Sequence, residues 1–526
     1  MRKCLFQALL ATSFILILFA CKKNSLPNLQ TTVTSDAINA FLFVPKNNGN
    51  NLADSIYCTI QNDTITGYYP LNTDPTKLVA SFSVSTDAHV LVNGITQISS
   101  VTANDYSKPV SYKVSLNDST TQTYTVILKK FTGLPIVYIN TNNSQISSKT
   151  VGVNGTFAID SNNVQFSSYS GTATFYLHGN STAIYPKQPY KVKLTSKSPL
   201  LGMPSNSKWI MLANYDDRTL LRNYVALQLS QMFGMNYTPR SQFVELMLNG
   251  QYVGNYQLIE EIDVDNNRLN ITSMKDGDTS GAKLTGGYLI EGDNKLEDST
   301  HTRFVTNLLQ NSFIIHEPSD SIVQQTNYIS NYMSTAEQAL YGSNFTDPIN
   351  GYRKYLNPVT FAQYFWVNEF SRNNDAGFWS STFLYKDKDS LLKMGPVWDF
   401  DIAFGNTTFN SNQNPQGWWI ANQTWFNRLL QDSAFTNIVI SQWKTMRNSL
   451  NSLNGMINNM AANLQQSEIQ NFKVWSITAS LPQGFSSETA GSYQGEINFL
   501  ENWITQRLNW VDANLQSLYI TQQPGQ

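Results

Sequence analysis

The chain has 526 residues, a formal net charge of −2 and only 14% charged residues. A charge so close to zero gives no sign of a polyanion-binding surface, so we expect no nucleic-acid partner. The length is ample for one or more apolar cores. Three cysteines and four scattered histidines show no metal-ligand spacing, which excludes a cysteine-rich zinc site.

Residues 1–20 are typical of a secretory signal peptide, because two basic residues precede an apolar stretch too short to span a membrane. The stretch ends in a small residue directly before Cys21, which resembles the lipobox of bacterial lipoproteins. That resemblance implies cleavage before Cys21 and its lipidation, with 21–36 as a polar tether. The alternative is an uncleaved signal anchor. We therefore expect an extracytoplasmic lipoprotein in the periplasmic or cell-surface leaflet.

Residues 37–131 predict a small all-β module. Short alternating or β-branched runs recur there between turn signals, a pattern that favours a β-sandwich. The runs are 40–44, 78–84, 89–92 and 124–128, with turn signals at Asn93-Gly94 and Asn117-Asp118. The module resembles the immunoglobulin-like modules that precede enzymatic domains in many surface lipoproteins.

Residues 136–520 predict one larger α+β domain with a helical C-terminal part. Strand-like runs come first, a helix is expected near 220–232, and the last hundred residues have apolar positions at helical spacing. The strand-like runs are 172–177, 191–194, 243–248 and 256–259, with an Asn249-Gly250 hairpin turn between the last two. Residues 286–293 are interpreted as a glycine-punctuated strand whose Glu291 and Asp293 face solvent.

Two carboxylates, Asp399 and Asp401, lie two apart inside the apolar and aromatic run 395–405. If this run is a strand, both side chains lie on one face. Burying two like charges is costly unless a cation or hydrogen-bond donors compensate. Oxygen-only ligands suit Mg²⁺, Mn²⁺ or Ca²⁺ better than zinc. The alternative is a tight turn whose Asp side chains bond backbone amides.

A third acid, Asp375, follows an aromatic helix candidate at 361–370 and precedes a strand candidate at 381–385. The order of helix, acidic loop, strand, turn and acidic strand predicts that Asp375 and Asp399 approach the same hairpin end. Phosphoryl transfer needs such a pair. One carboxylate orients the attacking hydroxyl, and another holds the metal that bridges the phosphates.

Four stretches in order then resemble the spore coat protein H (CotH) kinase family of atypical, secreted-type protein kinases. They are 178–182 with 185–194, 209–223, 243–261, and 374–375 with 396–405. Together they cover most of residues 136–410. The resemblance implies a kinase-like fold around a site for ATP and a divalent metal, with a protein as the phosphoryl acceptor.

The resemblance also implies roles for single residues. It implies that Asp399 is the metal ligand, that Asp401 is a second or supporting ligand, and that Asp375 is the catalytic-loop acid. Glu260 would be the partner of a phosphate-binding lysine. That lysine would be Lys187 or Lys191, with Lys193 as a further basic candidate. Lysines in half-exposed strands are more often solvated side chains, so the lysine assignment stays open.

One position departs from the family pattern. Family members often carry an Asn a few residues after the catalytic Asp as a further metal ligand, whereas Ser380 and Ser381 occupy that region here. An extracytoplasmic location also provides little ATP. Two hypotheses follow: transfer of the ATP γ-phosphoryl group to Ser or Thr of a protein, or a non-catalytic cell-surface protein that binds a glycan or protein partner on a kinase-like scaffold.

Overall fold

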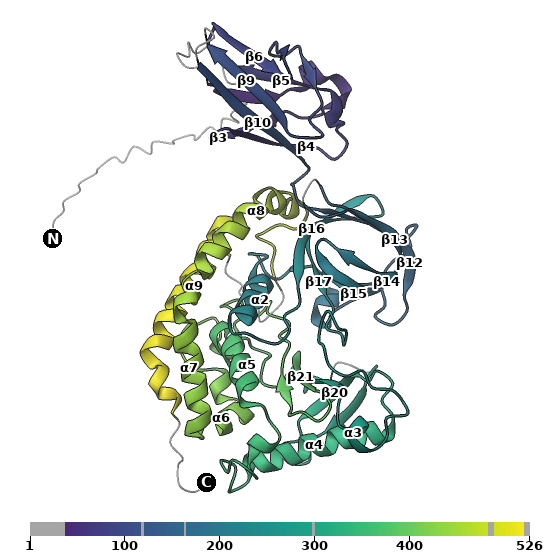
Figure 1. Cartoon of the computed structure of the whole chain (residues 1–526), viewed down its shortest axis with the longest axis vertical. Helices are drawn as coiled ribbons and strands as arrows, with labels where there is room; N and C mark the ends of the chain where they lie inside the picture. The colour runs from purple at the N-terminus through teal and green to yellow at the C-terminus, as the bar shows by residue number, and fades with distance from the viewer. Residues whose placement is uncertain (1–36, 117–119, 163–164, 297–299, 482–488, 520–526) are drawn as a thin grey trace, which may run out of the picture. The chain divides into compact units, whose positions relative to one another are not determined.

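A computed structural model describes residues 37–116, 120–162, 165–296, 300–481 and 489–519. The predicted signal peptide, the tether with Cys21 and the Asn117-Asp118 turn lie outside the described residues. The chain divides into two compact units, one up to Lys129 and one from Lys130 onward, shown in Figure 1. The predicted boundaries at 131 and 136 fall a few residues after this division.

The N-terminal unit is mostly β, as predicted, and its two sheets enclose one core. One sheet runs in the order β2 (Ile56–Tyr57), β1 (Ala40–Phe43), β5 (Leu78–Ser83), β8 (Ala103–Asn104). The other runs β3 (Thr59–Gln61), β4 (Thr64–Tyr69), β10 (Thr120–Lys130), β9 (Val110–Leu116), β6 (Ala88–Val92), β7 (Ile95–Thr96). The Asn93-Gly94 hairpin forms as predicted, with positive φ at both residues between β6 and β7.

The C-terminal unit begins with a closed seven-stranded barrel. Its order is β11 (Ile136–Asn140), β12 (Val153–Asp160), β13 (Tyr169–Leu177), β14 (Tyr190–Leu200), β15 (Met203–Leu212), β17 (Gln251–Glu260), β16 (Ser241–Leu248). The barrel closes because β11 pairs in parallel with β16, Ile136 opposite Glu245. The predicted Asn249-Gly250 turn connects β16 to β17, with both residues at positive φ. Closure leaves the barrel with its own apolar core.

The rest of this unit combines a five-stranded sheet with helices (Figure 1). The sheet order is β19 (Thr302–Val305), β20 (Ser312–Glu317), β18 (Tyr288–Gly292), β21 (Thr382–Lys386), β22 (Lys393–Met394). The helices of two turns or more are α2 (Arg222–Met232), α4 (Val323–Tyr341), α5 (Pro358–Ser371), α6 (Thr424–Leu430), α7 (Ser433–Leu450), α8 (Leu453–Val474) and α9 (Tyr493–Asn514). The unit is therefore mixed α and β, with the predicted helical C-terminal part.

Helix α5 is the buried centre of the helical part, and its sequence explains both ends. Asn357 caps its start by accepting hydrogen bonds from the backbone of Val359 and Thr360, and Pro358 fits the first helical position. Its side chains are buried on nearly every side, as expected of a helix this aromatic. It ends at Arg372, which adopts a left-handed conformation. The chain turns there and delivers Asp375.

The run 395–405 is a loop, so the predicted acidic strand is wrong. Asp399 has φ +67° and Phe404 has φ +49°, and a left-handed residue interrupts the alternation that a strand requires. The backbone is held by side-chain amides in place of a strand partner. Asn223 accepts the Phe400 N–H at 2.9 Å, and Asn406 donates to the Asp401 carbonyl at 2.7 Å.

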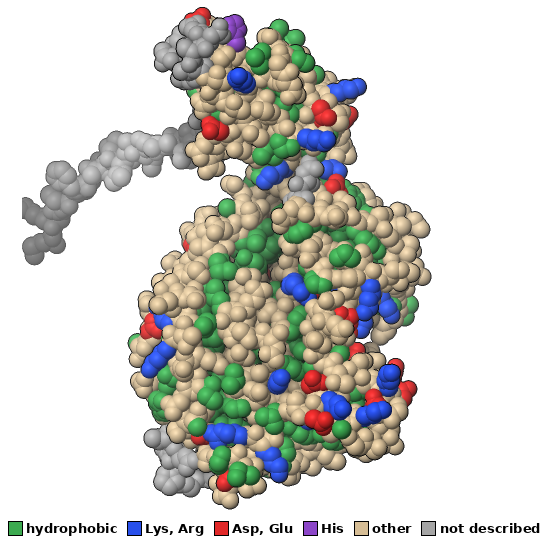
Figure 2. All heavy atoms as spheres, in the orientation of Figure 1, with side chains coloured by type: hydrophobic (Ala, Val, Ile, Leu, Met, Phe, Trp, Pro, Cys, Tyr) green, Lys and Arg blue, Asp and Glu red, His purple; other side chains and the backbone are tan. Residues whose placement is uncertain are grey.

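Two surface properties complete the description. Within the described ranges, none of the helices combines the length and the apolar character needed to cross a bilayer. On the face of the C-terminal unit that Figure 2 shows, Lys and Arg side chains are interspersed with Asp and Glu side chains.

Candidate active site

The loop between β15 and α2 carries two adjacent buried acids with different surroundings. Asp217 Oδ1 accepts from Thr219 and from Arg222 Nη1, and its Oδ2 accepts the Arg222 N–H at 2.7 Å. It thereby fixes the loop and the first turn of α2. Asp216 is 2% exposed, and its Oδ2 is buried with no hydrogen-bond donor among the described residues. Asp216 is thus the acid of this loop whose hydrogen bonding is incomplete.

The loop 395–405 brings Asp399 and Asp401 to Asp216. The Asp401 carboxyl lies within hydrogen-bonding range of the Asp216 carboxyl. Asn406 joins the two loops, because its side-chain amide donates to the backbone carbonyls of both Asp216 (3.0 Å) and Asp401 (2.7 Å). Asp399 Oδ2 accepts a hydrogen bond from Ser381 Oγ at 3.2 Å. Segments about 180 residues apart in the chain therefore build one acidic cluster.

Asp375 belongs to the same cluster and brings a cation with it. Its Oδ2 forms an ion pair with Lys295 Nζ at 2.5 Å, and Asn373, two residues earlier, donates to the Asp399 carbonyl at 3.2 Å. Asp375 raises and Lys295 lowers the pKa of Asp399. The structure therefore brings together three of the predicted site residues, Asp375, Asp399 and Asp401.

Electrostatics disfavour full ionisation of the cluster. Burial and then the charges of Asp401 and Asp375 raise the pKa of Asp399 well above its usual range. Burial and the neighbouring Asp216 do the same to the pKa of Asp401. Burial raises the pKa of Asp216 to about 7. The causes are desolvation and like charge, so either protons or a bound cation must neutralise the cluster.

A divalent cation fits this donor set. The buried, unpartnered Asp216 Oδ2 and the facing Asp401 carboxyl are two acceptors that lack a positive partner between them. Within the described residues, no three His, Cys, Asp or Glu side chains form a preassembled metal cage. Mg²⁺ does not require one, because it commonly keeps several waters and uses one or two carboxylates together with substrate phosphates. The residues present suit that mode of binding.

Lys187 lies on the other side of the Asp216 loop, 1% exposed. It donates to the Asn255 carbonyl at 2.5 Å and to Asn471 Oδ1 at 2.9 Å, and its ammonium lies 4.9 Å from the Tyr256 ring centre. Burial lowers the pKa of Lys187 to about 7, while Glu245 and Asp216 act in the opposite direction. The buried lysine is thus close enough to the acidic cluster to sense its charge.

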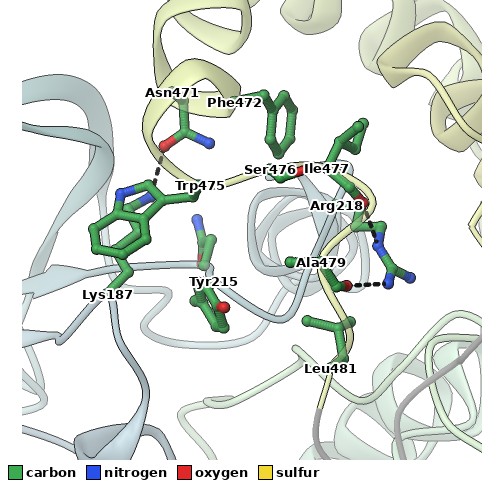
Figure 3. A pocket seen from close by; sticks show the side chains of 11 residues that line it. Lys187, Tyr215, Arg218, Asn471, Phe472, Trp475, Ser476, Ile477, Ala479 and Leu481 are labelled. Atoms are coloured by element: carbon green, nitrogen blue, oxygen red, sulfur yellow. Dashed lines mark hydrogen bonds between the residues drawn. The ribbon is translucent and has the colours of Figure 1, made fainter.

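A small hollow opens beside Lys187. In Figure 3, Lys187 and Arg218 lie on opposite sides of it, with Tyr215 between them and Trp475 beside Lys187. Gly254 makes this approach feasible, because its φ is +116° and a Cβ there would come within 3.1 Å of Asn471, Trp475 and Lys187 atoms.

The predicted pairing of Glu260 with a phosphate-binding lysine is wrong. Glu260 is fully buried, and its carboxylate forms an ion pair with Arg240 at 2.8 Å and accepts a hydrogen bond from Tyr237. Lys191 pairs with the next residue, Glu261, at 2.8 Å. The sequence could not separate these two glutamates, because the register of the strand end decides which one turns inward. Lys193, opposite Lys208 in the adjacent strand, is exposed.

A second, small hollow adjoins Asp399 directly. Apolar side chains from the barrel, from α2 and from the acidic loop line it, with the Asn223 amide at its edge. The apolar lining residues are Leu212, Leu227, Ile259, Trp398 and Phe400. A small apolar surface therefore lies next to a carboxylate of the cluster.

The sequence did not reveal some of the site residues, and for others it predicted the wrong surroundings. Asp216 lies in a stretch that carries the family resemblance, but only its unpartnered oxygen distinguishes it from Asp217. Lys295 has no motif of its own. Glu291 and Asp293 were expected to face solvent, yet Asp293 is 3% exposed beside Arg303 at 2.8 Å, and Glu291 binds His316 and the Ser381 backbone. Their strand lies between β20 and β21, so its ends are covered.

The matches to known proteins cover both units. The sequence model of the family described as "CotH kinase protein" matches residues 175–511, more than half of the chain, and that described as "SGBP, N-terminal" matches residues 51–128. A comparison with curated proteins found no match.

Among solved structures, the chain is similar to one described as a "putative glycoside hydrolase" from Bacteroides thetaiotaomicron, with 17% identity and a TM-score of 0.16. The match covers 33% of this chain and 51% of that one, so the chain spans about half of its length. The TM-score is too low to indicate a shared fold.

Proposed function

This chain belongs to the CotH kinase protein family, and from that premise we propose that it is an atypical protein kinase that transfers the γ-phosphoryl group of ATP to a Ser or Thr hydroxyl of a protein. The observation that carries the proposal is the buried cluster of Asp216, Asp375, Asp399 and Asp401. Its pKa shifts come from desolvation and like charge, and groups perturbed in this way gather at functional sites.

Asp399, Asp401 and Asp216 would hold a divalent cation, Mg²⁺ or Mn²⁺, since hard cations prefer oxygen ligands. A bound cation would neutralise charge on the phosphates of the nucleotide. The Asn406 amide keeps the two acidic loops together, so the backbones of Asp216 and Asp401 are held side by side before any ligand arrives. This preorganisation limits the entropy lost when the nucleotide binds.

Asp375 is the residue that would orient the acceptor hydroxyl and accept its proton. Its ion pair with Lys295 fixes the carboxylate and places a positive charge at the cluster. The apolar surface beside Asp399 would contact the adenine ring, and Lys187, which is near the Asp216 loop, would lie near the phosphates. We also propose that the C-terminal unit has a kinase-like fold. The position of the acidic cluster supports this, because loops that follow the barrel, α5 and β22 build it.

The direct test is transfer of labelled phosphate from ATP by the purified chain with Mg²⁺ or Mn²⁺. Asp375→Ala should lower the rate by about 10²- to 10⁴-fold, the range expected for loss of a general base. Asp399→Ala should abolish transfer. Asp263→Ala, which removes a carboxylate of a pair with Lys208 at 2.8 Å, is the matched control and should leave transfer unchanged. Equal transfer by wild type and Asp399→Ala contradicts the assigned role.

A second candidate is a non-catalytic surface protein that binds glycans. The observation that favours it is the match of residues 51–128 to the "SGBP, N-terminal" family, which fits a glycan-binding role. Thermal shift assays of the full chain separate the two candidates. ATP with Mg²⁺ should raise the melting temperature only if a nucleotide site exists, whereas oligosaccharides should raise it for a glycan-binding protein.

We propose further that Cys21 is lipidated and anchors the protein outside the cytoplasm. The support is the sequence before Cys21 alone. Mass spectrometry of the mature N-terminus should find an acylated Cys21, and Cys21→Ser should release the protein from the membrane fraction. An unmodified N-terminus beginning at Met1 contradicts the anchor.

A further inference from the structure

A line of polar contacts runs from the five-stranded sheet to Asp399. Glu291 of β18 lies between two partners: its Oε2 is 2.7 Å from His316 Nε2 of β20, and its Oε1 accepts the Ser381 N–H at 2.9 Å. Ser381 Oγ in turn donates to Asp399 Oδ2 at 3.2 Å. The Glu291 carboxylate therefore holds Ser381, and Ser381 in turn contacts Asp399 of the acidic cluster.

The sheet explains why Glu291 can act on Ser381. Strand β18 lies between β20 and β21, with Glu291 opposite Ile314 on one side and Phe383 on the other. Ser381 comes directly before β21, so it is delivered to the Glu291 end of the sheet. The His316 ring lies 5.4 Å from that of Phe383 and 4.7 Å from that of His301. These ring contacts pack around the His316 imidazole that pairs with Glu291.

Ser381 adopts a conformation that needs support. Its φ is +54°, a left-handed conformation that is uncommon for residues other than Gly and Asn and costs on the order of 1 kcal/mol or more. The hydrogen bonds to Glu291 and Asp399 hold it there. Its neighbour Ser380 makes different contacts: its N–H donates to the Asp375 carbonyl, and its carbonyl accepts from the Thr382 hydroxyl.

We propose that Ser381 Oγ supplies a neutral oxygen ligand to the cation of the acidic cluster, and that Glu291, held by His316, is the residue that positions it. This proposal rests on the proposed function, because it concerns the same cation. The hydroxyl donates its hydrogen to Asp399 and keeps its lone pairs for the cation.

A neutral ligand suits this cluster. Asp216, Asp399 and Asp401 already repel one another, and a further carboxylate would add to the repulsion. A hydroxyl oxygen adds coordination without adding charge. Residues that orient metal ligands typically contribute about 10- to 100-fold to metal affinity, so Glu291 should contribute measurably without touching the cation.

The experiment is a titration of the full chain with Mn²⁺, followed by the electron paramagnetic resonance signal of free Mn²⁺. Ser381→Ala and Glu291→Ala should each weaken binding by about 10-fold or more. Glu291→Gln should retain most of the affinity, because its amide oxygen still accepts the Ser381 N–H. Ser381→Asn should bind as tightly as wild type or more tightly, since Asn tolerates positive φ and offers an amide oxygen.

Asp263→Ala is the matched control, because Asp263 is as buried as Glu291 and also forms one ion pair. It should leave Mn²⁺ affinity unchanged. Melting temperatures without cation show whether each variant is folded. Wild-type affinity in Glu291→Ala or in Ser381→Ala overturns this inference and leaves the proposed function intact. Absence of Mn²⁺ binding by the wild type, with and without ATP, overturns both.

Discussion

Asp216 and Asp217 are neighbours in the chain, equally buried, and opposite in their surroundings. Asp217 receives four hydrogen bonds from Thr219 and Arg222, whereas Asp216 has an oxygen with no donor and faces a second carboxyl. A buried polar atom left without a partner costs about 1–3 kcal/mol. The contrast shows that Asp217 builds the loop, whereas the free oxygen of Asp216 supports the proposed cation site.

A second pair of buried groups extends the contrast. Glu369 of α5 and Arg507 of α9 are both fully buried, 2.6 Å apart, and Glu369 also accepts backbone N–H groups of Trp419 and Ala421. Burial lowers the pKa of Arg507 to about 10, and the Glu369 charge opposes that shift. Here two charges neutralise each other inside the helical part. In the acidic cluster, by contrast, Lys295 pairs with Asp375 and Lys187 lies near Asp216, so four carboxyls face two described cations.

We expect the largest loss of stability when Asp217 is removed. Asp217→Ala leaves the Arg222 guanidinium buried without its carboxylate, which should lower the free energy of unfolding by about 3–5 kcal/mol. Denaturant unfolding of the full chain, followed for the transition of the C-terminal unit, measures the loss. Asp216→Asn, one residue away, is the control and should not destabilise. Equal destabilisation by both variants removes the contrast between the two acids.

The next effect is the pH dependence that Asp216 causes. The pKa of Asp216 is raised to about 7 in the folded protein, against about 4 in an unfolded chain. The folded state binds the proton more tightly, so this group's stabilisation is present below about pH 4 and is lost as the pH rises through 7. The difference is on the order of 4 kcal/mol.

Thermal unfolding without divalent cations, between pH 4 and 7.5, measures this dependence. Asp216→Asn should flatten the decline, and saturating Mn²⁺ should reverse it at the upper end of the range. A wild-type profile identical to that of Asp216→Asn contradicts the raised pKa.

Lys187 gives a slope of opposite sign at higher pH. Burial lowers the pKa of Lys187 to about 7 in the folded protein, so the folded state binds this proton more weakly than the unfolded chain. Stability should therefore rise by a few kcal/mol as the pH increases from about 7 to 10. Lys187→Met should remove the rise. A matched substitution of the half-exposed Lys191 should leave the rise in place.

The smallest effect concerns the helix that delivers Asp375. Asn357→Ala removes the cap of α5 and should cost about 1 kcal/mol. Because the capped end lies a full helix away from Asp375, phosphoryl transfer by the folded variant should stay close to wild type. Asn357→Asp, which preserves the cap, should restore stability. A large loss of transfer in Asn357→Ala indicates that α5 moves as the site works.

The sequence predicted what local patterns determine. The Asn-Gly turns, helix α5 and the helical C-terminal part depend on neighbouring residues, and they form where expected. The acidic loop was interpreted as a strand because Asp399 and Asp401 lie two apart, and the left-handed Asp399 breaks the alternation that a strand requires. Asp399 and Asp401 still belong to one cluster. The loop and the Asn406 hydrogen bond to Asp401 position them, in place of a strand face.

The rest depends on contacts between distant segments. No local pattern distinguishes Asp216 from Asp217, or Glu260 from Glu261, because each pair has the same chemistry and differs only in what surrounds it. The pairing of Lys295 with Asp375 joins residues 80 positions apart. Glu291 looked exposed because its strand ends in charged residues, but His316 and Ser381 cover it.

Closure of the barrel by β11 has a consequence for how the protein is made and handled. The parallel pairing of Ile136–Asn140 with β16 joins the first strand of the unit to one that leaves the ribosome about a hundred residues later. The family match begins at residue 175, inside β13. An expression fragment cut at that match would lack β11, β12 and most of β13 and leave unpaired edges on β14 and β16, which are templates for aggregation. Fragments intended for crystallisation should therefore begin before Ile136.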